Sequence, residues 1–396
     1  MKKMLRFTTS DLDPDWQTQC MKHRGYRLEK LNTLAFPKGK TPLCEITGQP
    51  SSVQMITPYV TLFFATREDA LASWEAIMWK LCPLLGPLRD EPEVVGSEED
   101  RKRRKRTYDM SLRALIEMTS EESSTLLRDN KPRLAIPAAL QALKFTREVY
   151  GEGSVKLVPS FLLLAEAYIA MKKVSRAESF LTKANVCALK NESECTNDIK
   201  AQLHRNFGRV YMTKGRLSSA LKQLAYAVYY SSLHSGPEHV ETSRGYYECA
   251  IVFFEMHKIE QGLAFFDRVV DIWFKLLASL QNEDKIDEDK AGDLQDLLAN
   301  RGLEMLTRVF ETRAKYLGDT HIATGEAQYT LGLLHLFMGR TEDAAQQISN
   351  AASTYSSELG EDHPSTRDIL QVLTQIQEET RDDGNDEEEE MDSKEE

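Results

Sequence analysis

The chain has 396 residues, of which 41% are hydrophobic and 28% are charged, and its formal net charge is −12. This length is sufficient for one large core or for several stacked units. The acidic balance argues against nucleic acid as a partner. Part of it lies in the tail "RDDGNDEEEEMDSKEE", residues 381–396, which we expect to be disordered and solvated.

The N-terminus and the cysteines predict the compartment. The opening "MKKMLRFTTSDLDPDW" is charged and lacks the apolar stretch of a secretory signal, and no window approaches the ~18 apolar residues of a membrane helix. We therefore expect an intracellular protein with no membrane partner. The cysteines lack paired metal spacing, so we expect free thiols rather than disulfides. They are Cys20, Cys44, Cys82, Cys187, Cys195 and Cys249.

Residues 36–86 are predicted to form a small module, preceded by an N-terminal extension over residues 1–35. The middle of the module alternates like a short hairpin, and its end has helical spacing of apolar residues. The module resembles a MYND zinc finger, in which cysteine pairs precede an aromatic position and a helix carrying a tryptophan and a final cysteine. The matching residues are Cys44, Phe63, Trp74 and Cys82.

The other ligand positions of that finger are not filled by ligands. Thr47, Met55, Pro58 and Phe64 stand where cysteines belong, and Glu68 and Met78 or Trp79 stand near the remaining positions. Two tetrahedral zinc ions need about eight ligands in total. We therefore predict a degenerate MYND-like module with no metal and no other cofactor. The alternative is that Cys44 and Cys82 are ordinary buried thiols in a small irregular cap.

Residues 87–106 read as a charged linker that ends in the densest positive run of the chain, "RKRRKR", directly after "SEED". The run is typical of a nuclear localisation signal or of a contact with acidic tubulin tails or another acidic partner. The alternative is a solvated helix face leading into "TYDMSLRALIEM". The candidate interaction residues are Arg101, Lys102, Arg103, Arg104, Lys105 and Arg106.

From residue 107 to 380 a repeat of ~42 residues predicts an all-α, TPR-like α-solenoid of helix hairpins. Each unit carries small residues where two helices meet closely, and large residues fill the hairpin. The small positions of the first helices are Ala165, Gly208, Ala250 and Gly332. Two degenerate units are expected near Ser123 and near Ala291, which gives about six units, and the segment "STRDILQVLTQIQEET" is expected to cap the stack.

A recurring phrase marks the boundaries between units. It reads "SGPEHVET" at 235–242, "LGDTHIAT" at 317–324 and "LGEDHPST" at 359–366. We expect the glycine to end one helix, the acidic residue and the threonine to cap the next, and Pro364 to fit a first helical turn. His239, His321 and His363 could act as general bases, but their repetition favours a structural role at the boundary.

These repeats resemble the TPR variant of kinesin light chains, as in "NFGRVYMTKG" and "LGEDHP". Together with the module, the stretches "LAFPKGKTPLCE", "LCPLLGPLRDEPEVVGSEEDR", "AIPAALQALKF" and "SVKLVPSFLLLAEAY" resemble the zinc finger MYND domain-containing protein 12 family, MYND plus TPR proteins of cilia and flagella. The match covers roughly residues 34–275. The resemblance implies a non-catalytic axonemal protein with a cytoplasmic pool, associated with inner dynein arms and needed for flagellar motility. The partners that it implies are an inner-arm dynein heavy chain and another TPR protein, and the basic run adds tubulin as a candidate partner.

Motifs of enzymes are missing from the sequence: it has no phosphate-binding glycine loop, nucleophile elbow, zinc protease motif or SET methyltransferase signature. A chaperone-type carboxylate clamp is also disfavoured, because the comparable positions carry Leu162, Arg205, Tyr247 and Tyr329. The concave groove is expected to be aromatic and basic, with Arg205, Arg209, Tyr247 and Tyr329 as candidate contacts. A cytosolic TPR adaptor that binds a peptide or cargo in this groove is the alternative to the axonemal scaffold.

Overall fold

The computed structural model describes residues 25–32, 35–37, 41–89, 97–281 and 302–376. The chain forms two compact units, Met1–Arg216 and Leu217–Glu396, each of which is described by itself. Most of the predicted N-terminal extension, the beginning of the unit expected near Ala291 and the acidic tail lie outside the described residues.

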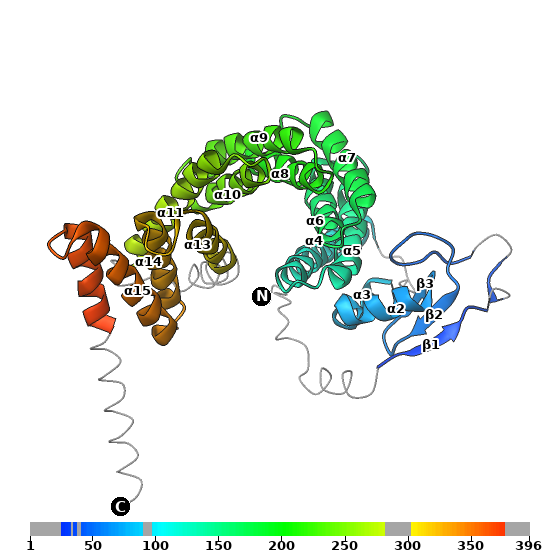
Figure 1. Ribbon diagram of the computed structural model, residues 1–396. Coiled ribbons are helices and arrows are strands. Elements are labelled where there is room, and N and C mark those ends of the chain that lie inside the picture. Colours follow the sequence, from blue (N-terminus) through cyan, green and yellow to red (C-terminus); the bar gives the residue numbers. More distant parts are fainter. Residues whose placement is uncertain (1–24, 33–34, 38–40, 90–96, 282–301, 377–396) are drawn as a thin grey trace, which may run out of the picture. The chain divides into compact units, whose positions relative to one another are not determined.

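The first unit opens with a three-stranded antiparallel sheet in the order β1-β2-β3 (Figure 1). Strands β2 (Val53–Ile56) and β3 (Thr61–Phe64) form the predicted hairpin. Strand β1 (Arg27–Lys30) pairs with β2 and lies before residue 36, so the module begins earlier than the predicted boundary. The sequence of β1 did not reveal this strand, because Leu28 is its sole apolar residue and no alternation is visible.

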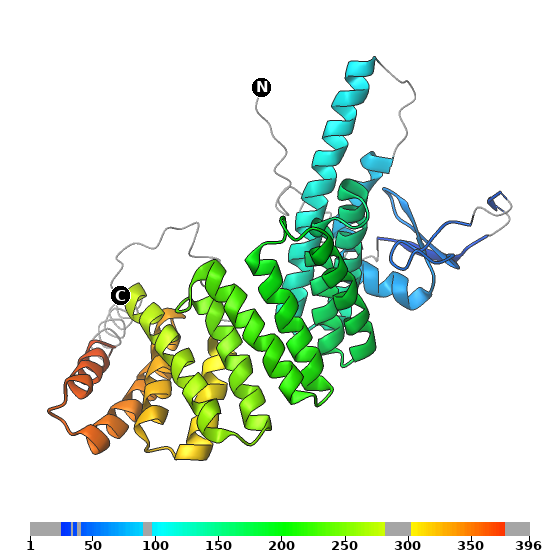
Figure 2. The ribbon, with the colours of Figure 1, turned by 90° about the horizontal axis from the view of Figure 1, so that it is seen from above.

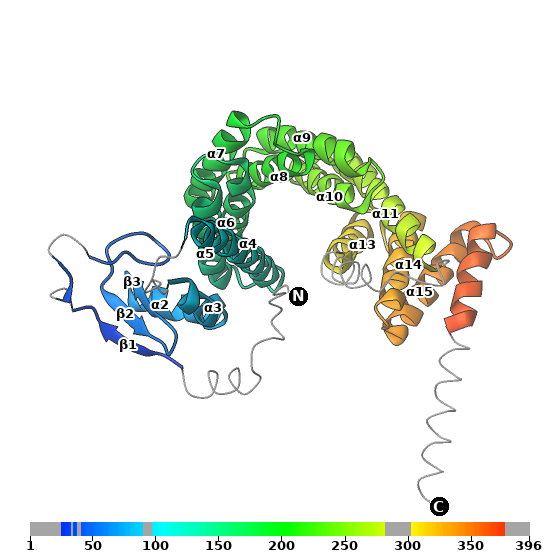
Figure 3. The ribbon, with the colours of Figure 1, turned by 180° about the vertical axis from the view of Figure 1, so that it is seen from behind.

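Helices follow the sheet and cover one side of it. They are α2 (Arg67–Ser73), a π-helical segment at Trp74–Met78 and α3 (Trp79–Arg89). Figure 3 shows α2 and α3 between the strands and the first repeat helices. One hydrophobic core joins all of these layers, with Phe64 from the sheet, Ile77 and Leu81 from the helices, and Leu112 and Ala135 from the repeats. The module therefore folds onto the first helix pair instead of forming a core of its own.

The first helix pair consists of α4 (Glu98–Arg128) and α5 (Pro132–Tyr150). Helix α4 begins with a capping box, in which the Ser97 hydroxyl accepts from the Asp100 N–H and the Asp100 carboxylate accepts from the Ser97 N–H. The end of the predicted linker, from residue 98 to 106, is therefore helix. Its first turns project beyond the neighbouring helices (Figure 2), and residues 97–107 are exposed.

The remaining helices of the first unit are α6 (Val158–Ala170), α7 (Val174–Lys190) and α8 (Asn197–Thr213). Helices α6 and α7 pack as a hairpin. The predicted small residues Ala165 and Ala177 are fully buried, as is Leu181 at a predicted large position. The close contacts of the hairpin thus lie where the repeat pattern predicts them.

The second unit contains α9 (Leu217–Ser235), α10 (Val240–Glu255), α11 (Ile259–Gln281), α13 (Leu303–Leu317), α14 (Ile322–Phe337) and α15 (Thr341–Leu359), followed by a helix over 364–376. Consecutive helices pack in pairs, α10 with α11 and α14 with α15. At Gly332 the contact is so close that an added Cβ would lie 2.5 Å from Ile348. The fold is all-α with TPR-like helix hairpins, as predicted. None of the described helices has the length and apolar character to span a membrane.

The boundary phrases stop one helix and start the next. Gly236, Gly318 and Gly360 have φ values of 105°, 95° and 90°, in the left-handed region that favours glycine. The predicted caps are wrong, because histidine and not the acidic residue or threonine caps the following helix. The Nδ1 atom of the histidine accepts from the backbone N–H two residues later in each phrase, at 3.2 Å for His239, 3.1 Å for His321 and 3.2 Å for His363.

In two of the three phrases the threonine instead points back to the glycine. The Thr242 hydroxyl donates to the Gly236 carbonyl and the Thr324 hydroxyl donates to the Gly318 carbonyl, both at 2.8 Å. The hydroxyl thus satisfies a carbonyl at the end of the preceding helix. The structural role predicted for the histidines is confirmed, because the Nδ1 atom of each one bonds to the backbone of the helix that follows.

Candidate functional site

The two cysteines that match the zinc finger are buried core residues of the first unit. Cys44 is 3% exposed and Cys82 is fully buried, among Met55, Leu62 and Phe64. Among the residues that the structure describes, no group of three or more His, Cys, Asp or Glu side chains is gathered so that it could hold a metal ion. The absence of zinc stays a prediction for elemental analysis.

Glu45, next to Cys44, anchors the module to helix α5. Its carboxylate accepts two hydrogen bonds from Arg89, at 2.9 and 3.0 Å, and pairs with Lys144, while Gln141 donates to its backbone carbonyl at 3.0 Å. Burial by itself would raise the pKa of Glu45, but Lys144 and Arg89 outweigh burial and lower the pKa. No sequence motif indicates this cluster, because Arg89 and Lys144 are 44 and 99 residues from Glu45.

The basic run lies on the exposed first turns of α4. The side chains of Arg101, Lys102, Arg103, Arg104, Lys105 and Arg106 extend from one helical segment into solvent. Lys102 pairs with Glu98 at 2.8 Å one turn earlier, an exposed pair of small energetic value. The role of the basic run as an interaction surface stays a prediction.

The candidate groove residues are divided between the units. Arg205 and Arg209 lie on α8 of the first unit, whereas Tyr247 and Tyr329 lie on α10 and α14 of the second. Arg205 is 14% exposed and 3.6 Å from Glu166, so its charge is balanced locally.

Tyr247 is largely directed into the core of the second unit. Its ring stacks on Phe266, with centroids 5.9 Å apart. Burial raises the pKa of Tyr247 to about 12. Of the four candidate groove residues, Tyr329 lines a cavity that the structure shows.

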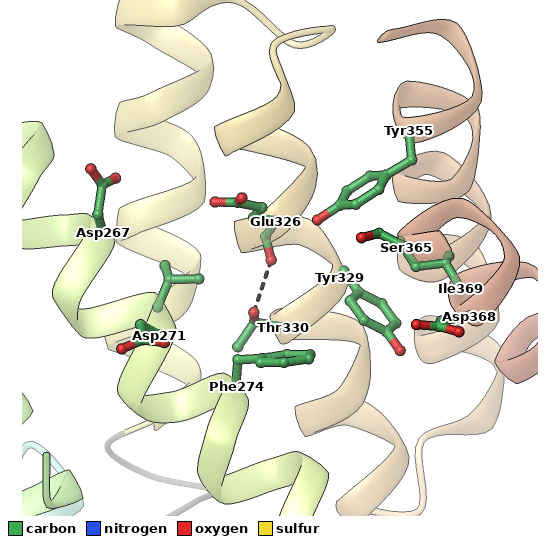
Figure 4. Close-up of a pocket in the computed structure, with 11 residues that line it drawn as sticks. Asp267, Asp271, Phe274, Glu326, Tyr329, Thr330, Tyr355, Ser365, Asp368 and Ile369 are labelled. Atoms are coloured by element: carbon green, nitrogen blue, oxygen red, sulfur yellow. Dashed lines mark hydrogen bonds between the residues drawn. The ribbon is translucent and has the colours of Figure 1, made fainter. Parts of the chain in front are cut away.

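This cavity, which we call the acidic pocket, has a volume of about 300 Å³ and lies within the second unit. Its walls come from α11, α14, α15 and the helix over 364–376 (Figure 4). Carboxylates and aromatic rings dominate the lining. The residues are Asp267, Asp271, Glu326 and Asp368, the aromatic Phe274, Tyr329 and Tyr355, and Val270, Thr330, Ser365 and Ile369.

A buried arginine lies behind one side of the pocket. Arg313 of α13 is 0% exposed, pairs with Asp267 and donates to the Ala323 carbonyl. Its Nη1 atom is 3.9 Å from a carboxylate oxygen of Glu326. Burial raises the pKa of Glu326, and the attraction of Arg313 offsets this only in part. Arg313 therefore holds Asp267 closely and leaves Glu326 incompletely balanced.

The aromatic side of the pocket remains accessible. Phe274 is 39% exposed, and its ring lies 5.9 Å from that of Tyr329 at an angle of 45°. Burial, with a contribution from Asp368, raises the pKa of Tyr329, and burial also raises the pKa of Tyr355. Both phenols are thus neutral near physiological pH. The pocket presents negative charge beside neutral aromatic faces, an arrangement suited to recognition.

Sequence reasoning found one residue of the acidic pocket, Tyr329, and missed its carboxylates. Asp267 and Asp368 are far apart in the chain, and each looks like an ordinary solvated acid within its own helix. No short motif relates them. The repeat register did not indicate the pairing either, because it places a further unit between those of α11 and α14, whereas the structure packs these two helices together.

No protein-family model matches the chain. Among solved structures, it is similar to BtubC (BKLC) from P. vanneervenii, with 16% identity and a TM-score of 0.40, over 67% of this chain and 89% of that one. The TPR-like repeats of a kinesin light chain candidate from Podosopora anserina have 14% identity and a TM-score of 0.34, over 61% and 95% of the two chains. PilF of Pseudomonas aeruginosa has 15% identity and a TM-score of 0.32, over 63% and 96%. The fold assignment rests on the helix hairpins themselves.

Proposed function

We propose that this chain is a non-catalytic protein-interaction scaffold of the motile axoneme of cilia or flagella, where it associates with inner dynein arms and supports beating. One observation carries the interaction role: an open acidic and aromatic pocket lies between helices of a TPR-like repeat, the architecture in which stacked hairpins present binding surfaces. Concave sites with a few charged groups among apolar walls are typical of recognition.

The axonemal part of the proposal is supported by the sequence resemblance to the zinc finger MYND domain-containing protein 12 family. The expected partners are an inner-arm dynein heavy chain, a second TPR protein and tubulin. The first unit supports a structural role for the former finger, because Cys44 and Cys82 lie in a core shared with the repeat helices. In this proposal the module has become part of the scaffold, and its family's zinc site has no role.

Affinity purification of the tagged full-length chain from detergent-extracted flagella tests the proposal. We expect recovery of a dynein heavy chain and a second TPR protein. Recovery of a kinesin without axonemal proteins would instead favour the cytosolic adaptor, and recovery of neither would contradict a role in partner binding. A strain lacking the chain should swim with impaired beating, and normal beating would contradict the motility role.

A further inference from the structure

We infer that the acidic pocket of the second unit binds an arginine side chain presented by a partner protein. This inference deepens the proposed interaction function and rests on it. It names the chemistry of the group that the pocket selects, which is a guanidinium cation held by carboxylates against an aromatic face.

The charge of the pocket is the first reason. Four carboxylates face one cavity, and the structure balances them unequally. Asp267 is held by Arg313, and Asp271 pairs with Arg268 at 3.2 Å and with Lys275 at 3.1 Å. For Asp368, no ion pair occurs within the described part of the chain, and Glu326 has a raised pKa in spite of Arg313. Two carboxylates thus carry charge that a cationic ligand would neutralise.

The aromatic wall is the second reason, and it is independent of the charge. Phe274 exposes 39% of its surface next to Tyr329, although α11 is otherwise an amphipathic helix with a large buried face. Figure 4 shows the two rings beside the carboxylates of Asp271 and Asp368. A cation over an aromatic face within about 6 Å of the ring is attracted by the ring quadrupole. An exposed phenylalanine in an acidic cavity is therefore suited to a cation.

The shape of the cation decides between arginine and lysine. A guanidinium is planar, stacks on aromatic rings and has donors in a fork that matches carboxylates, whereas an ammonium is a compact, strongly hydrated charge. The pocket has carboxylates on several sides of an aromatic surface, and a volume of about 300 Å³ is at the lower end of ligand sites. A single extended side chain fits this volume better than a folded peptide.

The inference is tested with the full-length chain and three short peptides: acetyl-Gly-Arg-Gly-amide, the same peptide with lysine, and the same peptide with citrulline, the uncharged isostere of arginine. Binding is followed by saturation-transfer and titration NMR. We expect the arginine peptide to bind about tenfold more tightly than the citrulline peptide, which corresponds to one charge-assisted contact. We also expect it to bind more tightly than the lysine peptide. Equal binding of the arginine and citrulline peptides, tighter binding of lysine, or no binding of the arginine peptide would each overturn the inference.

Variants locate the site. Asp368→Asn and Glu326→Gln should each weaken the arginine peptide by about tenfold, since each removes one charged acceptor. Asp319→Asn, an exposed carboxylate outside the pocket, is the matched control and should bind as the wild type does. Phe274→Leu should weaken binding severalfold, and Phe274→Tyr should retain it. Unchanged binding in Asp368→Asn and Glu326→Gln would place the peptide elsewhere and overturn the inference.

A separate comparison distinguishes the inference from the proposed function. If wild-type chain and Asp368→Asn recover the same axonemal partners in equal amounts, the scaffold role stands and the arginine pocket fails as a partner site. If the wild type recovers no partner, the scaffold role fails irrespective of peptide binding. Analytical sedimentation tests whether the pocket is occupied by a second copy of this chain. If the chain self-associates and Asp368→Asn abolishes this self-association, the inference of a separate partner protein is overturned. A monomeric wild-type chain supports the inference.

Discussion

Glu45 in the first unit and Glu326 in the second are glutamates in crowded surroundings whose pKa values shift in opposite directions. At Glu45 the carboxylate is the buried ion, 7% exposed, and Arg89 and Lys144 close around it. In the second unit the buried ion is the guanidinium of Arg313, and Glu326 remains 49% exposed at the edge of a cavity.

The difference shows how one type of charge serves two purposes in similar helical surroundings. A carboxylate surrounded by cations of its own unit is saturated and joins two layers of the fold. Glu326 shares the cation of Arg313 with Asp267, which lies closer to it, and the Glu326 carboxylate therefore still attracts a cationic ligand.

The largest effect is expected from Arg313→Ala, which removes the buried ion of the second unit. Loss of its packing and of the hydrogen bond to Ala323 should cost about 2–4 kcal/mol of unfolding free energy. Urea unfolding followed by circular dichroism, fitted with separate transitions for the two units, measures this. Arg308→Ala, on the exposed face of the same helix, is the control. Equal stability of the two variants would mean that Arg313 does not organise the second unit.

The second largest loss of unfolding free energy is expected from Glu45→Gln, because it removes the charge of the carboxylate that Arg89 and Lys144 surround. We expect a loss of about 1.5–3 kcal/mol at neutral pH, the range for hydrogen bonds to a charged group. Because the folded pKa of Glu45 lies below the ordinary 4.5, its contribution is present above 4.5 and is lost as the pH falls through the folded value. The wild type and the variant should therefore converge in acid. A stability difference that persists or grows in acid would contradict a lowered pKa of Glu45. Glu152→Gln, at a side chain that is 82% exposed, serves as the control.

His321→Ala should have a smaller effect on the second unit alone. Removal of the imidazole acceptor leaves the N–H of Ala323 without its cap, at a cost of about 1 kcal/mol. His321→Asn should restore most of this loss, because asparagine is a good N-cap residue. Hydrogen exchange at the first turn of α14 is the direct measurement. If exchange there is the same in the alanine and asparagine variants, the imidazole is not the cap.

Glu326→Gln should have the smallest effect on the free energy of unfolding, and this variant should be slightly more stable than the wild type. The folded pKa of Glu326 is raised, so its ionised form costs stability at neutral pH, and this cost disappears as the pH falls through the folded pKa. After allowance for solvent screening, the variant should gain less than about 1 kcal/mol at neutral pH, and the gain should vanish in acid. Thermal unfolding over a pH series decides this. A destabilised variant at neutral pH would show that the carboxylate is satisfied, as Glu45 is.

The repeat fold was predictable because its signals are local. Ala165 and Ala177 occupy fixed positions in the α6–α7 hairpin, as Gly332 does in the α14–α15 hairpin. The glycines of the boundary phrases need only their own backbone conformation. The caps were assigned to the wrong residues because histidine, threonine and the acids of the phrase are all possible acceptors. Which of them faces the N–H groups depends on the turn geometry. The sequence pattern does not contain that geometry.

The acidic pocket and the anchor at Glu45 were not predictable for a different reason. Asp267, Glu326 and Asp368 meet only after α11, α14 and the last helix have packed, and each acid is ordinary in its own helix. Likewise, Glu45 has no partner nearby in the chain. The start of the module was also missed, because β1 gains its place by pairing with β2 and not by its own apolar pattern.

The boundary phrase has a consequence for how such a chain changes over generations. Within about eight residues it holds the glycine that ends one helix, the histidine that starts the next and, in two of its three copies, a threonine that binds the glycine carbonyl. A duplication or deletion of one whole period would therefore carry a complete helix stop and start with it, and both neighbouring hairpins would keep their ends. The number of units is the property that recombination can alter at least cost, whereas a break inside a hairpin would separate Gly332 from Ile348.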